Sequence, residues 1–154
     1  MSDSFSSAFG SSAAIMIMFV FFLIALIPAI LFLLSLQKAL QRCAPESRTA
    51  SPGQVWLLLI PLFNIVWIFL LVGKISSSLR NEFLRRQIPL PEAEPGKTLG
   101  IAMAVLNLTS VIPLVGLVTG LAGFVCWILY WVKISGYSKQ IAAPTMVQGA
   151  PYPA

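Results

Sequence analysis

Residues 12–37 read SAAIMIMFVFFLIALIPAILFLLSLQ, a run without a single charged side chain. A bilayer core about 30 Å thick is crossed by roughly 20 apolar residues in a helix, so this run is long enough to span it. Two further stretches, 49–73 and 98–132, also carry no charge. Three such stretches in a chain of 154 residues predict an integral membrane protein.

Composition agrees with a membrane location. Hydrophobic residues make up 58% of the chain and charged residues only 10%, whereas a soluble domain carries about 25% charged residues. The formal net charge is +5, and the basic residues flank the apolar runs. This arrangement favours contact with the anionic headgroups of a bilayer over nucleic acid. Cys43 and Cys126 are expected at different depths, and therefore unpaired.

The predicted fold is an all-α membrane protein, a small bundle of about four transmembrane helices with one amphipathic interfacial helix. Residues 1–140 form a single domain in this interpretation, and 141–154 form a disordered tail. The expected spans are 12–36, 52–73, 97–112 and 114–133, and the interfacial helix is 74–87. In that last helix Ile75, Leu79 and Phe83 repeat every four residues, a pattern typical of a helix lying on the membrane surface.

Proline and small residues mark expected irregularities and contacts in these helices. Proline removes a backbone hydrogen bond and is expected to break or kink three segments, at Pro28, Pro61 and Pro113. Small residues spaced along a helix allow a neighbouring helix to approach closely. The candidates for such packing are Ala25, Ala29, Gly116, Gly120 and Gly123.

Aromatic and basic side chains are expected to anchor the helices at the two membrane interfaces. Tryptophan and tyrosine favour the headgroup level, and lysine and arginine favour the cytoplasmic side. The candidate anchors are Trp56, Trp67, Trp127, Tyr130, Trp131, Lys74, Arg80, Arg85, Arg86 and Lys133.

The basic residues allow two topologies. Four crossings place both chain ends in the cytoplasm, but leave Lys38, Arg42 and Arg48 outside, against the positive-inside tendency. Alternatively, the second segment is re-entrant and turns within residues 60–64, which puts every basic loop in the cytoplasm and the N-terminus outside. Broken backbone at that depth must be covered by protein. The length of the second uncharged stretch favours four crossings.

The residue inventory argues against chemistry at membrane depth. The proposed spans contain no Asp, Glu, Lys or Arg, and the chain contains no His. Proton relays and metal or haem sites depend on such groups, so we expect no enzyme activity, no cofactor and no metal site. The polar residues expected at depth are Asn64, Asn107, Thr109 and Ser110. They either satisfy backbone groups freed by the prolines or, for the two asparagines, line a small polar cavity.

Two stretches of the chain echo each other. The first contains Ile60-Pro61, Trp67 and Lys74-Ile75-Ser76, and the second contains Ile112-Pro113, Trp127 and Lys133-Ile134-Ser135. A duplicated hairpin would explain the echo, as would the general tendency of membrane helices to end in Trp and then Lys. If the duplication is real, both Lys-Ile-Ser ends should lie on the same or on pseudo-symmetric faces of the membrane.

Segment 52–67, PGQVWLLLIPLFNIVW, is the most distinctive part of the sequence. Together with 74–83 and 126–134 it resembles a group of small bacterial multi-pass membrane proteins that have no established activity. The resemblance implies a bacterial inner-membrane location and transfers no site residues.

These observations favour a non-catalytic accessory or scaffold subunit that packs against itself or a larger membrane complex. A small oligomeric channel or transporter with proline-broken helices is the alternative, and a lipid-binding membrane protein is the third possibility.

Overall fold

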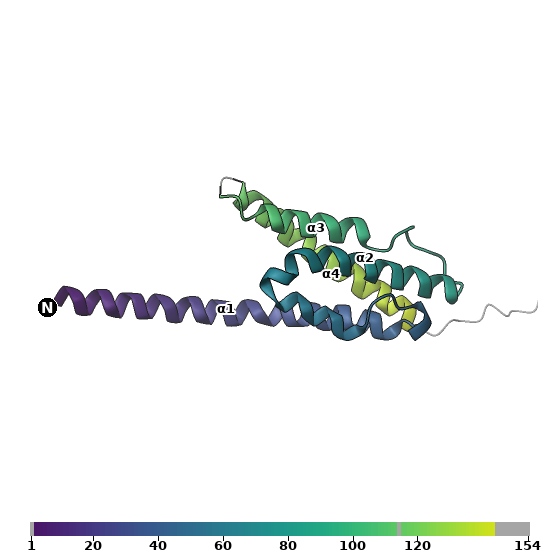
Figure 1. The fold of residues 1–154 in the computed structure, drawn as a ribbon, viewed down its shortest axis with the longest axis horizontal. Coiled ribbons are helices and arrows are strands. Elements are labelled where there is room, and N and C mark those ends of the chain that lie inside the picture. Colours follow the sequence, from purple (N-terminus) through teal and green to yellow (C-terminus); the bar gives the residue numbers. More distant parts are fainter. Residues whose placement is uncertain (1, 114, 144–154) are drawn as a thin grey trace, which may run out of the picture. The chain divides into compact units, whose positions relative to one another are not determined.

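The computed structural model describes residues 2–113 and 115–143, with side chains from residue 12 onward. All elements in this part of the chain are helical (Figure 1). They are α1 (Ser2–Arg42), the short 3-10 helix η1 (Pro45–Ser47), the 3-10 helix η2 (Pro52–Leu59), α2 (Pro61–Arg85), α3 (Lys97–Thr109) and α4 (Gly116–Ala142).

Three of the described helices are long and apolar enough to cross a membrane: residues 12–42 of α1, all of α2, and all of α4. Helix α3, with 13 residues, is apolar but shorter. This set of helices confirms the predicted all-helical class and supports a membrane location. The chain divides into two compact units, one ending at Leu34 and one beginning at Ser35.

The first unit is the N-terminal part of α1. Its side chains from Ile15 to Ile24 are all large or apolar and exposed, as suits a helix surrounded by lipid. Pro28 lies inside α1, and the helix continues past it to Arg42. The expected break at Pro28 is therefore not a helix end, because an interior proline removes one hydrogen bond while the bonds of the flanking turns remain.

In the second unit, the last turns of α1 run parallel to α4. Trp131 Nε1 donates to Ser35 Oγ at 2.8 Å. About two helical turns further along both helices, Arg42 donates to Ser138 Oγ at 2.9 Å. Both bonds join residues 96 positions apart. A constant offset is the mark of two helices that run in the same direction, so the C-terminal ends of α1 and α4 lie together.

The chain after α1 runs antiparallel to α2. Thr49 Oγ1 donates to the carbonyl oxygen of Lys74 at 2.7 Å, and Trp67 Nε1 donates to the carbonyl oxygen of Gln54 at 3.0 Å. The later residue of the first segment, Gln54, therefore pairs with the earlier residue of α2, Trp67, which is the order expected of antiparallel segments. The reversal falls at Ile60, whose backbone is extended, and at Pro61, which opens α2 because its fixed φ suits a first helical position.

Helix α2 does not end at Gly73, which corrects the predicted division into a span 52–73 and a separate helix 74–87. The span instead comprises η2, the turn and the first half of α2, and the remaining residues extend α2 to Arg85. Ile75, Leu79 and Phe83 are fully buried. Their stripe therefore packs in the protein core and is not available to a membrane surface.

Helices α3 and α4 form a hairpin, and Figure 1 shows them side by side. A Cβ placed on Gly100 would lie 2.8 Å from the ring of Tyr130, and one on Gly123 would lie 2.9 Å from Asn107 Oδ1. Gly100 also abuts Val72 of α2, which joins this hairpin to the preceding one. Two hairpins and the end of α1 thus make up the second unit.

Candidate functional site

The C-terminal ends of α1, α2 and α4 meet at Arg86. Its guanidinium donates to the carbonyl oxygen of Ile141 at 2.6 Å and to that of Arg42 at 3.3 Å. The last carbonyls of a helix have no partner within the helix, and a cation there also complements the helix dipole. Arg86 therefore caps two helices that are distant in the sequence.

Glu82 supplies the counter-charge and has no exposed side-chain surface. Its Oε1 accepts from Arg86 Nε at 2.5 Å and from Arg85 at 2.6 Å. Its Oε2 accepts from the backbone N–H of Ala44 at 2.9 Å, and from Arg85 Nε at 3.2 Å. A buried carboxylate is tolerated when its lone pairs are satisfied in this way. We term Arg42, Ala44, Glu82, Arg86 and Ile141 the Glu82 junction.

Arg48 and Cys43 extend this arrangement around the end of α1. Arg48 donates to the carbonyl oxygens of Cys43 at 2.8 Å and Gln41 at 2.9 Å. The Cys43 thiol is buried, which together with the nearby Glu82 charge raises its pKa to about 11. A thiol with a raised pKa is a poor nucleophile at neutral pH. Both Cys43 and Cys126 are free thiols, and protein covers Cys43 at the end of α1.

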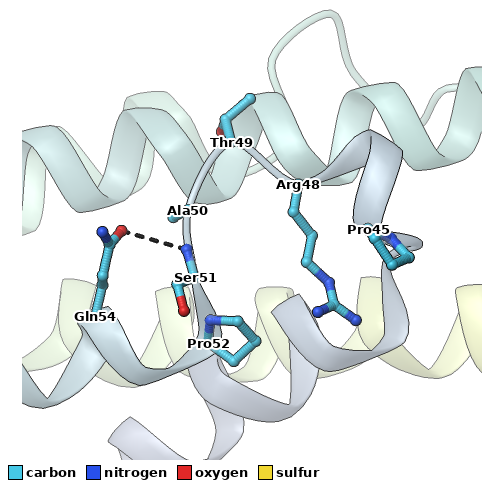
Figure 2. A pocket seen from close by; sticks show the side chains of 7 residues that line it. All are labelled: Pro45, Arg48, Thr49, Ala50, Ser51, Pro52 and Gln54. Carbon is cyan, nitrogen blue, oxygen red and sulfur yellow. Dashed lines mark hydrogen bonds between the residues drawn. The ribbon is translucent and has the colours of Figure 1, made fainter.

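A surface groove lies next to the end of α1, and Figure 2 shows its lining. The lining residues are Pro45, Arg48, Thr49, Ala50, Ser51, Pro52 and Gln54. Gln54 Oε1 accepts from the backbone N–H of Ser51 at 3.3 Å and so caps the start of η2. The Arg48 guanidinium is engaged with the carbonyls of α1. These contacts hold the loop in place, and we assign the groove no ligand.

A second charged cluster fixes the linker before α3 to α4. Glu92 accepts from Lys133 Nζ at 2.8 Å, from the Tyr137 hydroxyl, and from the backbone N–H of Gly96 at 2.9 Å. Burial alone would raise the pKa of Glu92, but these three donors outweigh it and the net pKa is lowered. The Glu92 cluster thus holds a carboxylate in its charged form.

The glycines of α4 that were predicted to allow close helix packing face α3. A Cβ on Gly116 would meet the carbonyl oxygen of Ser110, and one on Gly120 would lie 3.6 Å from the Ser110 Cβ. With Gly123 against Asn107, this stripe receives α3 of the same chain. On α1, Ala25 is exposed and Ala29 is half-buried.

The polar residues near the hairpin turns bond locally. Thr109 Oγ1 donates to the carbonyl oxygens of Val105 and Leu106 at 3.1 and 3.0 Å, and Ser110 Oγ donates to that of Asn107 at 2.7 Å. Asn64 is half-buried in the first turn of α2. Pro61 opens α2, and Pro113 lies between α3 and α4. The hydroxyl groups of Thr109 and Ser110 thus donate to backbone carbonyls near the connection between α3 and α4.

Several of the predicted interface anchors make contacts within the second unit. Tyr130 is buried. The indole N–H groups of Trp56, Trp67 and Trp131 donate to Gln37 Oε1, the Gln54 carbonyl and Ser35 Oγ, respectively. The Trp127 ring lies beside those of Phe124 and Trp131.

The predicted basic anchors have different surroundings. Lys74 Nζ lies 4.9 Å from the centroid of the Trp67 ring, which is a cation–π distance. Arg80 is exposed on α2. Arg85 and Arg86 bind Glu82, and Lys133 binds Glu92. Arg86 thus belongs to the Glu82 junction, and Arg85 lies at the edge of this junction.

The two carboxylates at the centres of these clusters were missed by sequence reasoning. Glu82 falls within the predicted interfacial helix 74–87, and Glu92 falls between that helix and the predicted span 97–112. A signal for Glu82 was present, because Arg85 and Arg86 follow it at the spacings that bring side chains together on a helix. No comparable local signal exists for Glu92, whose side-chain partners Lys133 and Tyr137 lie 41 and 45 residues away.

Chemically, the arrangement joins helix ends and fixes a linker. Within residues 2–113 and 115–143, no group of three or more His, Cys, Asp or Glu side chains is placed to hold a metal ion. Comparisons with protein-family descriptions, with curated proteins and with solved structures found no match to this chain.

Proposed function

We propose that this chain is a non-catalytic, multi-pass protein of a bacterial inner membrane that acts as an accessory or scaffold subunit of a larger membrane assembly. The observation that carries the proposal is the Glu82 junction. Its ionised groups bind backbone carbonyls and one another, so they stabilise the arrangement of helices instead of facing a substrate. The resemblance of residues 52–67 to small bacterial membrane proteins supports the inner membrane as the location.

The surface that supports assembly is α1. The stripe of glycines on α4 is filled by α3, whereas the apolar side chains around Ala25 on α1 are exposed and offer a surface for a companion. Ala25 and Ala29 are one helical turn apart, and small residues at this spacing let a second helix approach closely. The companion is therefore a membrane-spanning helix, either of a second copy or of another subunit.

We also propose the re-entrant topology for the second segment, in which a companion subunit covers the exposed turn at residues 60–63. The antiparallel pairing of 49–54 with 67–74 supports it. So does the meeting of the C-terminal ends of α1, α2 and α4 at Arg86, because it gathers Arg42, Arg48 and Arg85 at one end of the second unit. Four crossings would separate these charges. Re-entry keeps them together on the cytoplasmic side, in accord with the positive-inside tendency.

The end of the second unit that carries Arg42, Arg48 and Arg85 contacts the anionic leaflet of the bilayer in this proposal. Arg80 and Lys139 are exposed beside the junction, and Arg85 retains 48% of its side-chain surface. Each basic residue near an anionic surface contributes about 1 kcal/mol of attraction. We expect these side chains to lie at the headgroups.

Purification in a mild detergent tests the proposed role. The expected result is a complex of fixed stoichiometry that exceeds the 16.7 kDa of one chain, with either a second copy or another subunit. Combining Ala25→Leu with Ala29→Leu should dissociate it, while Ala13→Leu on the same helix should leave it intact. A wild-type chain that is monomeric in both detergent and lipid nanodiscs would contradict the proposal.

A further inference from the structure

Asn107 is a polar residue on an apolar surface of α3. It is exposed, and so are four aliphatic residues near it in the second half of α3 and the turn that follows: Val105, Leu108, Val111 and Ile112. We term these five residues the α3 face. The α3 face therefore contains a single carboxamide among branched aliphatic side chains.

Protein covers only the first part of the helix stripe that carries Asn107. Gly100 abuts Val72 of α2, and Met103 is buried. Asn107 lies seven residues after Gly100, on nearly the same side of the helix, yet it is exposed. The facing stripe of α2 changes in the same way, since Val72 keeps 1% of its surface and Ile65, seven residues earlier, keeps 47%. The packing between α2 and α3 thus does not reach Asn107.

The expected depth of Asn107 is near the middle of the bilayer. Asn107 lies ten residues after Lys97, and Gly123, which faces it from α4, lies ten residues before Lys133. Ten residues of helix rise about 15 Å, which is half of a hydrocarbon core of about 30 Å. Both lysines belong to the same end of the α3–α4 hairpin, because Glu92 binds Lys133 and also the backbone N–H of the residue before Lys97.

The Asn107 carboxamide has unused hydrogen-bonding groups at this depth. The backbone carbonyl of Asn107 accepts from Ser110 Oγ at 2.7 Å, but its side-chain amide has no hydrogen-bond partner within residues 2–113 and 115–143. An asparagine side chain offers two donor hydrogens and an acceptor oxygen. Hydrocarbon satisfies none of them, so the amide favours a polar partner on a neighbouring helix.

From these observations we infer that the α3 face binds the α3 face of a second copy of this chain, with the two Asn107 carboxamides hydrogen-bonded to each other. A carboxamide is self-complementary, because each N–H group donates to the oxygen of the other copy. Two copies with the same orientation in a bilayer are related by an axis along the membrane normal, so Asn107 meets its own copy at the same depth. The inference rests on the membrane assembly proposed above and names the occupant of one of its surfaces.

The α3 contact adds to the proposed contact at Ala25 and Ala29 of α1. A hydrogen bond between membrane helices changes a dissociation constant by about 3- to 30-fold. This effect is too small to hold an assembly together by itself. Loss of the α1 contact should therefore still dissociate the complex, whereas loss of the Asn107 amide should only weaken it.

Cysteine cross-linking tests whether two α3 faces meet. Leu108→Cys, next to Asn107, is compared with Leu121→Cys, an exposed position on α4 two residues from Gly123. Both are made with Cys126→Ser, which leaves the buried Cys43 as the native thiol. After mild oxidation of membranes, we expect a disulfide-linked dimer of this chain from Leu108→Cys alone. Equal yields from the two positions, no dimer, or a cross-link to a different chain would overturn the pairing.

Replacement of the amide measures its contribution. Copies carrying a donor or an acceptor fluorophore at Lys139→Cys, with Cys126→Ser, are mixed in liposomes, and energy transfer is followed as lipid is added. Asn107→Leu should raise the dissociation constant about 3- to 30-fold, and Asn107→Gln, which keeps the carboxamide, should stay closer to wild type. The matched control is Asn64→Leu on α2, which should bind like wild type. Equal constants for Asn107→Leu and wild type, or equal losses in Asn107→Leu and Asn64→Leu, would overturn the inference.

The outcomes separate this inference from the proposed function. A complex that depends on Ala25 and Ala29, but that Asn107→Leu leaves unchanged, supports the accessory role and removes the α3 pairing. A Leu108→Cys cross-link in a chain whose stoichiometry is insensitive to Ala25 and Ala29 does the reverse. Protection of the Cys43 thiol until unfolding shows that the Asn107→Leu chain is folded, so that a loss of binding reports on the α3 face.

Discussion

Arg86 donates a 2.6 Å hydrogen bond to the carbonyl oxygen of Ile141, which lies 55 residues later in the chain. The same guanidinium bonds the carbonyl of Arg42, 44 residues earlier. The Arg86 side chain thus holds the C-terminal ends of α1, α2 and α4 together. Its position depends on Glu82, whose carboxylate it contacts through Nε. The stability of the second unit should therefore be sensitive to this single pair.

Replacement of the buried carboxylate tests that dependence. Glu82→Gln leaves the partly exposed Arg86 without its counter-charge, and losing a hydrogen bond to a charged group costs about 1.5–3 kcal/mol of unfolding free energy. Equilibrium unfolding in mixed detergent micelles measures the loss. The control is Glu94→Gln, which removes the exposed Glu94–Lys97 pair, and exposed pairs contribute about 0.2–1 kcal/mol. Equal losses in the two variants would contradict the role of the Glu82 junction.

Gly100 tests the contact between the two hairpins. Ala at this position would put a Cβ 2.6 Å from Val72 and 2.8 Å from Tyr130, and overpacking of this kind costs about 1–3 kcal/mol. The matched control is Gly136→Ala in α4, where nothing lies within 4 Å of the new Cβ. That change should instead stabilise by about 0.4–1 kcal/mol, because alanine lowers the entropy of the unfolded chain. Thermal unfolding in detergent distinguishes the two.

The Glu92 cluster predicts a dependence on acid pH. Because the folded pKa of Glu92 is lowered, its contribution to stability is complete above the unfolded value of about 4.3, and is lost as the pH falls through the folded pKa. Melting temperatures of wild type should therefore fall below about pH 4.3 more steeply than those of Glu92→Gln. The neighbouring charge of Lys133 is retained in both proteins. Parallel curves over this range would show that Glu92 titrates normally.

The two thiols should differ in reactivity. Cys43 is buried with its pKa raised to about 11, and its Sγ lies 3.4 Å from the carbonyl oxygen of Ala39, whereas Cys126 is half-buried. In detergent at neutral pH, N-ethylmaleimide should modify Cys126 before unfolding and Cys43 only after it. Mass spectrometry of Cys43→Ser and Cys126→Ser, each with one remaining thiol, assigns the adducts. Rapid modification of Cys43 in the folded protein would show that the end of α1 is open.

The membrane class and the helical elements could be predicted because uncharged runs leave a strong local signal. The bounds of α2, Pro61 and Arg85, could not be predicted in this way. Gly73 suggested an end, but a glycine inside a helix costs only about 1 kcal/mol. Full burial of Leu71, Ile75 and Leu79 on either side of it contributes more than that, at about 1.5–3 kcal/mol for each side chain. Tertiary packing therefore overrode the local preference.

The Glu82 junction shows what sequence periodicity cannot reach. The amphipathic pattern correctly placed Ile75, Leu79 and Phe83 on one face, but the expectation that this face lies on a membrane surface was wrong, because protein covers it. The contacts that decide this, from Ala44 to Glu82 and from Arg86 to Ile141, join distant parts of the chain. Pairings at such distances have no fixed spacing and so leave no periodic mark in the sequence.

Dependence on a lipid or detergent environment tests the central claim most directly. Membranes from expressing cells are washed with alkaline carbonate, and the chain is then extracted and transferred to buffer. The chain should remain in the membrane pellet, require detergent for extraction, and aggregate once the detergent is removed, because side chains such as Phe21 and Leu117 are exposed. A monodisperse chain in detergent-free buffer would contradict membrane integration and every proposal built on it.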